Sequence, residues 1–206
     1  MLTLYCATTN AGKLREFLHA AEELAPDFFS IQPLPGLKQI AAPEETGETF
    51  EANAIEKAIY YSRFTPELMF AEDSGLEVDA LGGAPGVHSA RFSDPGATDE
   101  RNNRLLLEKL RGAAQRTARY VCTIALVQQG QVLGTFRGTV EGEILDEERG
   151  SNGFGYDPMF YCPAFHCTFG EATTEQKLDV SHRGEATRKM LRFLKERATA
   201  DRAPGS

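Results

Sequence analysis

The sequence predicts an α/β protein with a mixed β-sheet. Segments with the composition of strands alternate with segments whose apolar residues recur at helical spacing. Two long β-prone segments, 118–128 and 131–144, meet at Gly130 like the strands of an antiparallel hairpin. Alternating strands and helices that also include a hairpin predict parallel and antiparallel neighbours in one sheet. We expect the hairpin to project as a second lobe, which leaves a cleft.

The first part of the chain predicts two strands and two helices. Residues 2–8 form an apolar strand, and a helix over 12–24 follows, for which Asn10 is a suitable N-cap. The segment 31–42 is rich in proline and glycine and predicts a short strand and a loop. A second helix is expected over 48–64, where it stops before a proline. Its apolar residues at helical spacing are Phe50, Ala54, Ile55, Ala58 and Ile59.

The remaining segments predict two short strands, a helix, the hairpin and a C-terminal helix. Residues 68–71 form a buried strand that ends in two acids, and residues 76–81 form another strand before a glycine-rich loop. Thr98, followed by two acids, opens a helix that extends to about Arg111. The last helix begins near Ser181.

Length and composition predict one two-lobed domain, 1–198, and a flexible C-terminal tail, 199–206. The net charge of −8 argues against a nucleic-acid polymer as the main ligand, because binding to its backbone needs clustered Lys and Arg. A nucleotide remains compatible with this charge. No apolar run approaches the length of a membrane span, and the N-terminus lacks the pattern of a secretion signal. We therefore expect a cytoplasmic protein without a membrane partner.

The four cysteines, Cys6, Cys122, Cys162 and Cys167, form no CxxC pair, and we interpret them as reduced thiols. The stretch from Cys162 to Cys167 also contains His166, so it offers ligand types found in zinc sites. The sequence has no second cluster of such ligands. This favours loop packing over a metal site.

The turn ATTNAGK, between the first strand and the first helix, has the composition of a phosphate-binding loop. Around Gly12 and Lys13 a Walker A loop needs Gly and Ser or Thr where this chain has Ala7 and Leu14, which disfavours a P-loop kinase or GTPase. The free N–H groups of a helix start can still bind phosphate, with Lys13 adding a charge and the polar side chains adding hydrogen bonds. A plain strand-to-helix turn is the alternative.

Acidic residues gather before the second helix. Glu48 and Glu51 fall in its first turn, where acids commonly just offset the helix dipole. Glu44 and Glu45 lie ahead of the helix and are not explained in this way. A hard cation such as Mg²⁺ binds one or two carboxylates together with phosphate oxygens, so this segment is a candidate metal site.

Asp73 follows a predicted buried strand and precedes Ser74 and Gly75. Open α/β sheets bind ligands at such strand ends. The carboxylate could bind a metal or take a proton from an attacking water. A turn formed by Asp-Ser-Gly is the alternative.

Two further motifs predict contacts to a base. In SNGFGYDPMFY, glycines surround Phe154 and Tyr156, which frees a ring to stack on a base, while Asp157 can bond a base edge. The alternative is a glycine-rich turn whose aromatic residues belong to the core. In SHR, His182 and Arg183 lie at a helix start, where a cation is unusual and suggests an anionic or electron-rich partner. The alternative for His182 is an exposed or core histidine.

Together these motifs supply the components of a nucleoside triphosphate site, and the chain closely resembles the inosine triphosphate pyrophosphatase family. The resemblance spans residues 4 to about 193. It implies an elongated mixed sheet flanked by helices, two lobes around a central active-site cleft, and a homodimer. It also implies Mg²⁺-dependent hydrolysis of ITP, dITP and XTP to the monophosphate and pyrophosphate, which cleanses the nucleotide pool. The motifs are ATTNAGK (7–13), EETGETFEANA (44–54), AEDSGLEVDALGGAPGVHSARF (71–92), GFGYDP (153–158) and SHRGEA (181–186).

The resemblance implies roles for individual residues. Glu44 and Asp73 would hold Mg²⁺, and Asp73 would accept the proton of the water that attacks the α-phosphorus. His182 and Arg183 would contact the 6-keto edge of the purine, whereas the 6-amino group of adenine would oppose the guanidinium. The other substrate-binding residues are Thr8, Thr9, Asn10, Ala11, Gly12 and Lys13 for the triphosphate, Ser74 and Lys177 for the nucleotide, and Phe154, Gly155, Tyr156 and Asp157 for the base.

The chain departs from the family pattern at two positions. Thr9 stands where the family often has Gly, which would ease a tight turn, and Glu72 stands where the family often has Asp. The role of Glu72, and the choice between Glu44 and Glu45 as metal ligand, stay open.

Three other functions fit parts of the sequence. A Maf-like pyrophosphatase acting on pyrimidine or modified nucleotides is disfavoured by the SHR and GFGYDP motifs. A non-catalytic nucleotide sensor is disfavoured by the paired acids Glu44 and Asp73. A dinucleotide-dependent oxidoreductase is disfavoured because no GxGxxG follows the first strand.

Overall fold

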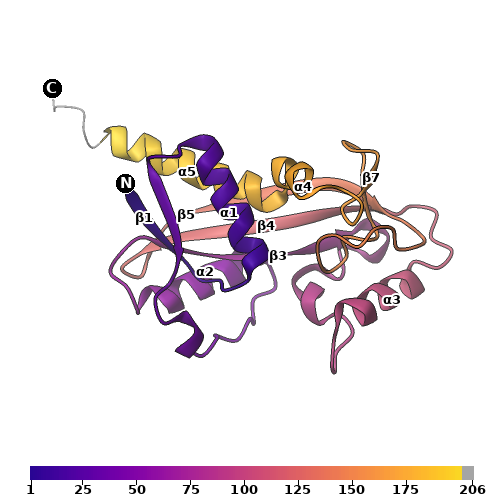
Figure 1. Cartoon of the computed structure of the whole chain (residues 1–206). Helices are drawn as coiled ribbons and strands as arrows, with labels where there is room; N and C mark the ends of the chain where they lie inside the picture. Colours follow the sequence, from indigo (N-terminus) through magenta and orange to yellow (C-terminus); the bar gives the residue numbers. More distant parts are fainter. Residues whose placement is uncertain (201–206) are drawn as a thin grey trace.

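A computed structural model describes residues 1–200, which form a seven-stranded sheet in the order β2-β1-β3-β4-β5-β6-β7 (Figure 1). β1 pairs in parallel with β2 and β3, and the later pairs are antiparallel, so the predicted mixed sheet is confirmed. The strands are β1 Leu2–Cys6, β2 Phe29–Pro33, β3 Met69–Val78, β4 Thr117–Gln128, β5 Gln131–Ile144, β6 Phe160–Cys162 and β7 Cys167–Thr168.

Helices cover both faces of the sheet (Figure 1). Leu4, Phe70 and Ile124 pack on one face with α1 and α5, whereas Ala71 and Ala125 pack on the other face with α2. None of the helices within residues 1–200 has both the length and the apolar character needed to cross a membrane. The helices are α1 Ala11–Leu24, α2 Phe50–Ser62, α3 Asp99–Lys109, α4 Thr174–Val180 and α5 His182–Ala200, with 3₁₀ turns at Leu37–Gln39, Asp79–Leu81 and Gly86–Arg91.

The long hairpin of β4 and β5 joins two apolar clusters. One cluster lies under α1 and α5. The other contains Leu76, Leu106, Tyr120 and Phe160, so it lies between α3 and the short strands β6 and β7. In Figure 1 the hairpin runs from the part with the N-terminus and β1 to the part with α3 and β7. A separate hydrophobic cluster therefore stabilises each end of the elongated sheet.

Capping side chains explain where the predicted helices begin. The Asn10 side chain accepts hydrogen bonds from the N–H groups of Gly12 and Lys13, as predicted. Thr49 and Thr98 cap α2 and α3 in the same way. Because Thr49 is the cap, α2 begins two residues later than predicted. α2 also ends two residues earlier than predicted, and the same is true of α3 and β1.

β3 differs from the prediction. The sequence suggested two strands separated by a turn at Asp73-Ser74-Gly75, but Met69–Val78 is one continuous strand. Each of its ten residues pairs with β4, including Asp73 with Thr123 and Ser74 with Cys122. The ladder to β4 supplies the backbone hydrogen bonds that a turn would have supplied locally, so pairing overrides the turn preference. The two acids thus lie within the strand and not at its end.

The prediction also missed three short elements, α4, β6 and β7. α4 has seven residues, too few for a helical period to emerge, although Thr173 and Gln176 form a capping box that the sequence displayed. β6 and β7 have three and two residues. The predicted tail began at residue 199, but α5 extends to Ala200. The rest of the predicted tail, 201–206, lies outside the described residues.

Gly138 sets how closely α5 approaches β5, and we expect Gly138→Ala to lower the thermal unfolding midpoint by roughly 2–10 °C. A Cβ at Gly138 would overlap the carbonyl oxygen of His182 and crowd the backbone N–H of Ala186, neither of which can move without the helix. Gly134→Ala is the matched control on the same strand, because its Cβ would meet only the Phe136 ring, 3.1 Å away. Equal midpoints for the two variants would contradict this account.

Candidate active site

The site is built where β1 and β3 separate. β3 pairs with β1 only at Met69 and Phe70, then continues for eight residues along β4. From residue 71 to residue 75, no described strand pairs with that edge of β3. β2 lies on the far side of β1, so the chain order reverses between β1 and β3. Such a switch point leaves a crevice beyond the end of the first strand, which is where ligands bind in open α/β sheets.

The predicted phosphate loop lies at this crevice. It runs from the end of β1 into the start of α1, and Thr9, Asn10 and Ala11 are exposed. The Thr8 hydroxyl accepts a hydrogen bond from the Asn10 N–H at 3.1 Å, which fixes the turn. The Lys13 ammonium forms an ion pair with the Glu72 carboxylate of β3. The loop therefore presents the start of α1 and a lysine to the open edge of β3.

Alternation along β3 directs neighbouring side chains to opposite faces of the sheet. Glu72 and Ser74 lie on the face of α1 and α5, where both contact Arg183. Asp73 lies on the face of α2 and contacts Asn53 and Lys57. These groups reach the crevice from two sides of one strand.

Asp73 is held by two residues of α2. Asn53 Nδ2 donates to Asp73 Oδ2 at 3.0 Å, and Lys57 Nζ donates to Asp73 Oδ1 at 3.0 Å. Burial raises the pKa of Asp73 above its ordinary value, although Lys57 and Asn53 oppose that effect. A carboxylate with a raised pKa is a better proton acceptor, provided that it remains ionised.

A cation already lies between two of the predicted acids. Lys57 Nζ contacts Glu45 Oε1 at 2.8 Å as well as Asp73, so Glu45 is linked to Asp73. Glu44 is exposed and has no ion pair or hydrogen bond to any described side chain. Within residues 1–200, no cluster of three or more His, Cys, Asp or Glu could hold a metal. The oxygen donors here suit Mg²⁺, provided that phosphate oxygens complete its coordination.

A cavity of about 300 Å³ lies on the α5 side of the crevice. Ten of the predicted substrate-binding residues line it, and they come from five separate segments of the chain. The predicted residues Thr8, Thr9, Ala11, Gly12, Glu44 and Asp73 do not line it. The ten are Asn10, Lys13, Ser74, Phe154, Gly155, Tyr156, Asp157, Lys177, His182 and Arg183.

Asp157 organises the loop on the outer side of this cavity. Its Oδ1 accepts from the Tyr120 hydroxyl at 3.1 Å, and its Oδ2 accepts from the Phe154 N–H at 2.8 Å and pairs with Lys177. Gly153 has a φ of +77°, and a Cβ there would overlap the Asp157 carboxylate. This glycine is required for the loop to close around Asp157.

Phe154 presents its ring to the cavity with 40% of its surface exposed. The Lys177 ammonium lies 4.8 Å and the Arg183 guanidinium 5.7 Å from the ring centroid. Both cations are within range of a cation–π contact. The ring thus forms an exposed aromatic face beside two positive charges.

Arg183 is buried in a network of acids. Nη1 donates to Glu16 Oε1 at 3.1 Å, Nη2 donates to Ser74 Oγ at 2.9 Å, and Nε lies 3.8 Å from Glu72 Oε2. Burial opposes the charge of Arg183, but Glu16 and Glu72 outweigh it and raise the pKa. The pKa of Glu72 is lowered despite its burial, because Lys13 and Arg183 favour the carboxylate. The network keeps a charged guanidinium at the cavity wall.

His182 lies beside Arg183 and is buried against Tyr120, with ring centroids 5.0 Å apart and planes 10° from parallel. Burial and the positive charges of Arg183 and Lys177 hold the pKa of His182 well below its usual value. The imidazole is therefore neutral at pH 7. Its Nδ1 has no hydrogen-bond partner among the described residues.

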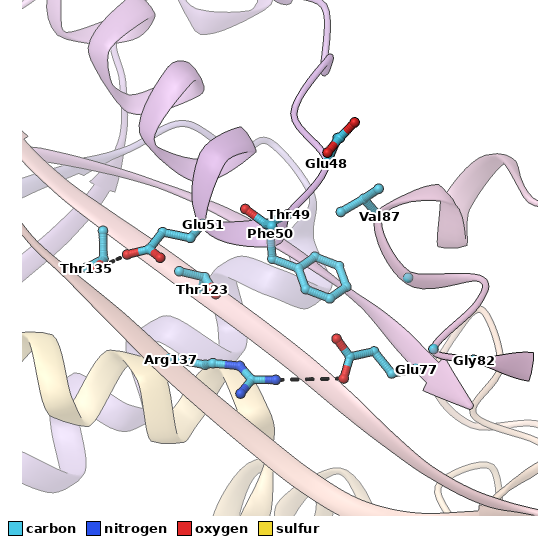
Figure 2. Close-up of a pocket in the computed structure, with 12 residues that line it drawn as sticks. Glu48, Thr49, Phe50, Glu51, Glu77, Gly82, Val87, Thr123, Thr135 and Arg137 are labelled. Atoms are coloured by element: carbon cyan, nitrogen blue, oxygen red, sulfur yellow. Dashed lines mark hydrogen bonds and ion pairs between the residues drawn. The ribbon is translucent and has the colours of Figure 1, made fainter. Parts of the chain in front are cut away.

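A second hollow, of about 480 Å³, lies on the α2 face (Figure 2). Figure 2 shows the Phe50 ring pointing into it, with an ion pair between Arg137 and Glu77 and a hydrogen bond from Thr135 to Glu51. None of the predicted site residues lines it. The hollow therefore does not belong to the crevice.

The model of the Ham1 family matches residues 4–193. The chain belongs to the Ham1 family. Relatives include a dITP/XTP pyrophosphatase of Acidobacterium capsulatum, 50% identical over 94% of this chain and 98% of that protein, and one of Exiguobacterium, 47% identical over 92% and 95%. Solved structures of Ham1 proteins from Staphylococcus aureus and Coxiella burnetii have TM-scores of 0.83 and 0.84. Each is 38% identical and covers 95% of this chain and at least 99% of its own.

In this Ham1 family chain, several polar residues that hold the site together were not predicted from the sequence. Asn53 and Lys57 are one helical turn apart on a helix face that is otherwise apolar, and that spacing could have revealed them. Glu16 follows Lys13 on α1 and gave no comparable pattern. Tyr120 lies in a strand whose residues 120–127 are all buried and gave no polar pattern, so its bond to Asp157 could not be predicted.

Proposed function

We propose that this chain hydrolyses ITP, dITP and XTP to the monophosphate and pyrophosphate, and so removes deaminated purine nucleotides from the nucleotide pool. The observation that carries the proposal is the continuity of the crevice. A phosphate-binding turn at Asn10 and Lys13 and a base-sized cavity at Phe154 and Arg183 share one lining, beside the open edge of β3. The names of the Ham1 relatives support the same substrate class.

In the proposed reaction, a water oxygen attacks the α-phosphorus and the bond to the bridging α–β oxygen breaks. Asp73 takes the proton of the water, and pyrophosphate leaves. Residues 8–13 bind the triphosphate through the start of α1, and Lys13 offsets charge on the departing group. Lys57 and Asn53 hold the Asp73 carboxylate in one orientation.

The proposed cofactor is Mg²⁺, held by Asp73 and an acid of the 44–45 pair. When bound, it would neutralise charge on the phosphate oxygens. The family resemblance favours Glu44, whereas Glu45 is the acid that the structure links to Asp73. Glu45→Gln and Glu44→Gln, assayed across a Mg²⁺ titration, distinguish them, because the ligand's loss raises the Mg²⁺ concentration needed for half-maximal rate.

Base recognition is assigned to the cavity. Phe154 stacks on the purine, and Asp157 with Lys177 binds its edge. Arg183 donates to the 6-keto group, which ITP, dITP and XTP share and ATP lacks. Neutral His182 can also take part as a donor or acceptor.

We further propose that residues 1–198 act as one two-lobed domain, that the protein is a homodimer, and that it works in the cytoplasm. The two apolar clusters joined by β4 and β5 support the two lobes. Light scattering of the purified chain tests the dimer.

A panel of ITP, dITP, XTP, ATP, GTP and pyrimidine triphosphates, with and without Mg²⁺, tests the activity through released pyrophosphate. Selective, Mg²⁺-dependent release from the first three is expected. Binding of ITP without release would instead indicate a nucleotide sensor. Preferred release from pyrimidine nucleotides would indicate a Maf-like specificity, and either result would overturn the proposal.

Tyr120→Phe is expected to raise the KM for ITP roughly 3- to 10-fold with little change in kcat, because Asp157 loses one donor that orients it. Steady-state kinetics measure the change. Tyr60→Phe is the control, since its hydroxyl bonds the exposed Ala41 carbonyl away from the cavity. A fall in kcat at constant KM would contradict a positioning role in binding.

A further inference from the structure

Two cysteines at the far end of the sheet face each other. β6 and β7 pair with Cys162 directly opposite Cys167. Two positions further along the strands, the Phe169 N–H donates to the Phe160 carbonyl at 3.0 Å. Because hydrogen-bonded pairs alternate in an antiparallel ladder, the two cysteines also occupy such a position, with Cα atoms about 5.5 Å apart. That Cα separation lies at the commonest value for disulfides, and the paired side chains share one face. In a hydrogen-bonded pair the Cβ atoms lie about 5.5 Å apart, wider than the roughly 3.8 Å of a disulfide, so the two strands must shift for the bond to close, and the closed bond is strained and readily reduced.

The turn between the strands fixes this register. The N–H groups of Phe165 and His166 both donate to the Cys162 carbonyl at 3.1 Å. His166 has a φ of +55°, in the left-handed region, which returns the chain to Cys167. Cys162 is buried and Cys167 is half-buried, so one thiol is accessible and the other lies behind it.

The other two cysteines have no such arrangement. Cys6 lies on β1 and Cys122 on β4, with β3 between them, so about two strand spacings separate their backbones. That exceeds the reach of a disulfide. No third metal-ligating residue joins Cys162 and Cys167 within residues 1–200, so the pair is a dithiol and not a zinc centre.

We propose that Cys162 and Cys167 form a reversible intramolecular disulfide by exchange with a small-molecule disulfide. The Cys167 thiolate attacks one sulfur of that disulfide, and the other sulfur leaves as a thiol. The Cys162 thiolate then attacks Cys167 Sγ in the mixed disulfide and releases the second thiol. Two protein thiols are oxidised by two electrons, the small disulfide is reduced to two thiols, and the two protons end on the released thiols.

The disulfide would constrain the segment that supports the loop of residues 153–157, which lines the cavity. Directly after the hairpin, the Gly170 N–H donates to the Asp157 carbonyl at 2.9 Å, and the Asn152 N–H donates to the Gly170 carbonyl at 2.9 Å. Phe169 stacks against Tyr120, which bonds Asp157. Closing a loop this short is expected to raise the thermal midpoint by at most about 4–8 °C, because strain in the bond subtracts from the gain.

Burial raises the pKa of both thiols, and Glu171 and Cys162 add to this effect at Cys167. The thiolate is the attacking species, so exchange is slow at neutral pH and accelerates about tenfold per pH unit below the pKa. Slow exchange at neutral pH distinguishes this pair from a cysteine that senses peroxide by reacting rapidly.

The test incubates the full chain with oxidised glutathione at pH 8, alkylates the remaining thiols in denaturant and analyses the peptides by mass spectrometry. The expected product lacks two hydrogens across residues 162 and 167, retains alkylated Cys6 and Cys122, and reverts with dithiothreitol. Cys162→Ala should instead accumulate glutathione on Cys167. Stable glutathione on Cys167 of the unmodified chain, or four alkylated cysteines, would overturn the proposal.

Discussion

Asp73→Asn is expected to reduce pyrophosphate release from ITP by about 10²- to 10⁴-fold, the usual contribution of a positioned general base. The amide has the same shape as the carboxylate but cannot take the proton of the attacking water. It also removes one of the two carboxylates that Lys57 contacts. Single-turnover assays with saturating ITP and Mg²⁺ measure the loss at the chemical step.

Glu77→Gln is the matched control for this variant. Glu77 lies on the same strand and the same face, two pairs of residues further along, and makes only long ion pairs of 3.7–3.8 Å with two arginines. The control should retain activity, and both variants should unfold cooperatively near the midpoint of the unmodified chain. Turnover by Asp73→Asn within about tenfold of the unmodified chain would mean that another group accepts the proton.

Arg183→Lys is expected to lower kcat/KM for ITP by about 10- to 100-fold while changing that for ATP much less. Lysine keeps a positive charge near Glu16 and Glu72 but loses the planar fork that donates in two directions. The ratio of kcat/KM values for ITP and ATP measures the effect. An unchanged ratio would show that selectivity arises elsewhere in the cavity.

The structure gives the reason for replacing Arg183 with lysine and not with alanine. Arg183→Ala would leave the buried carboxylates of Glu16 and Glu72 without their shared cation, and breaking a buried ion pair costs about 3–5 kcal/mol. Loss of stability would then obscure any change in selectivity. Arg188→Lys is the control, since it lies five residues further along α5 and pairs with exposed Glu23.

Parts of the fold whose physical causes are local could be predicted from the sequence. Asn10 and Thr98 mark helix starts because a capping side chain reaches only two or three residues along the chain. The hairpin of β4 and β5 was predictable because a glycine turn joins its strands. The motifs around Lys13, Asp73 and Arg183 indicated the family, and the comparisons confirm it.

How those motifs meet depends on contacts between segments that are far apart in the sequence. β3 runs straight through Asp73 because β4 pairs with every residue, and this continuity directs Glu72 and Asp73 to opposite faces. The partners of the site residues are distant in sequence: Lys57 links Asp73 to Glu45, and Glu16 holds Arg183 from the other end of the chain. Ion pairs and strand ladders depend on distance in space, which a sequence of residues does not specify.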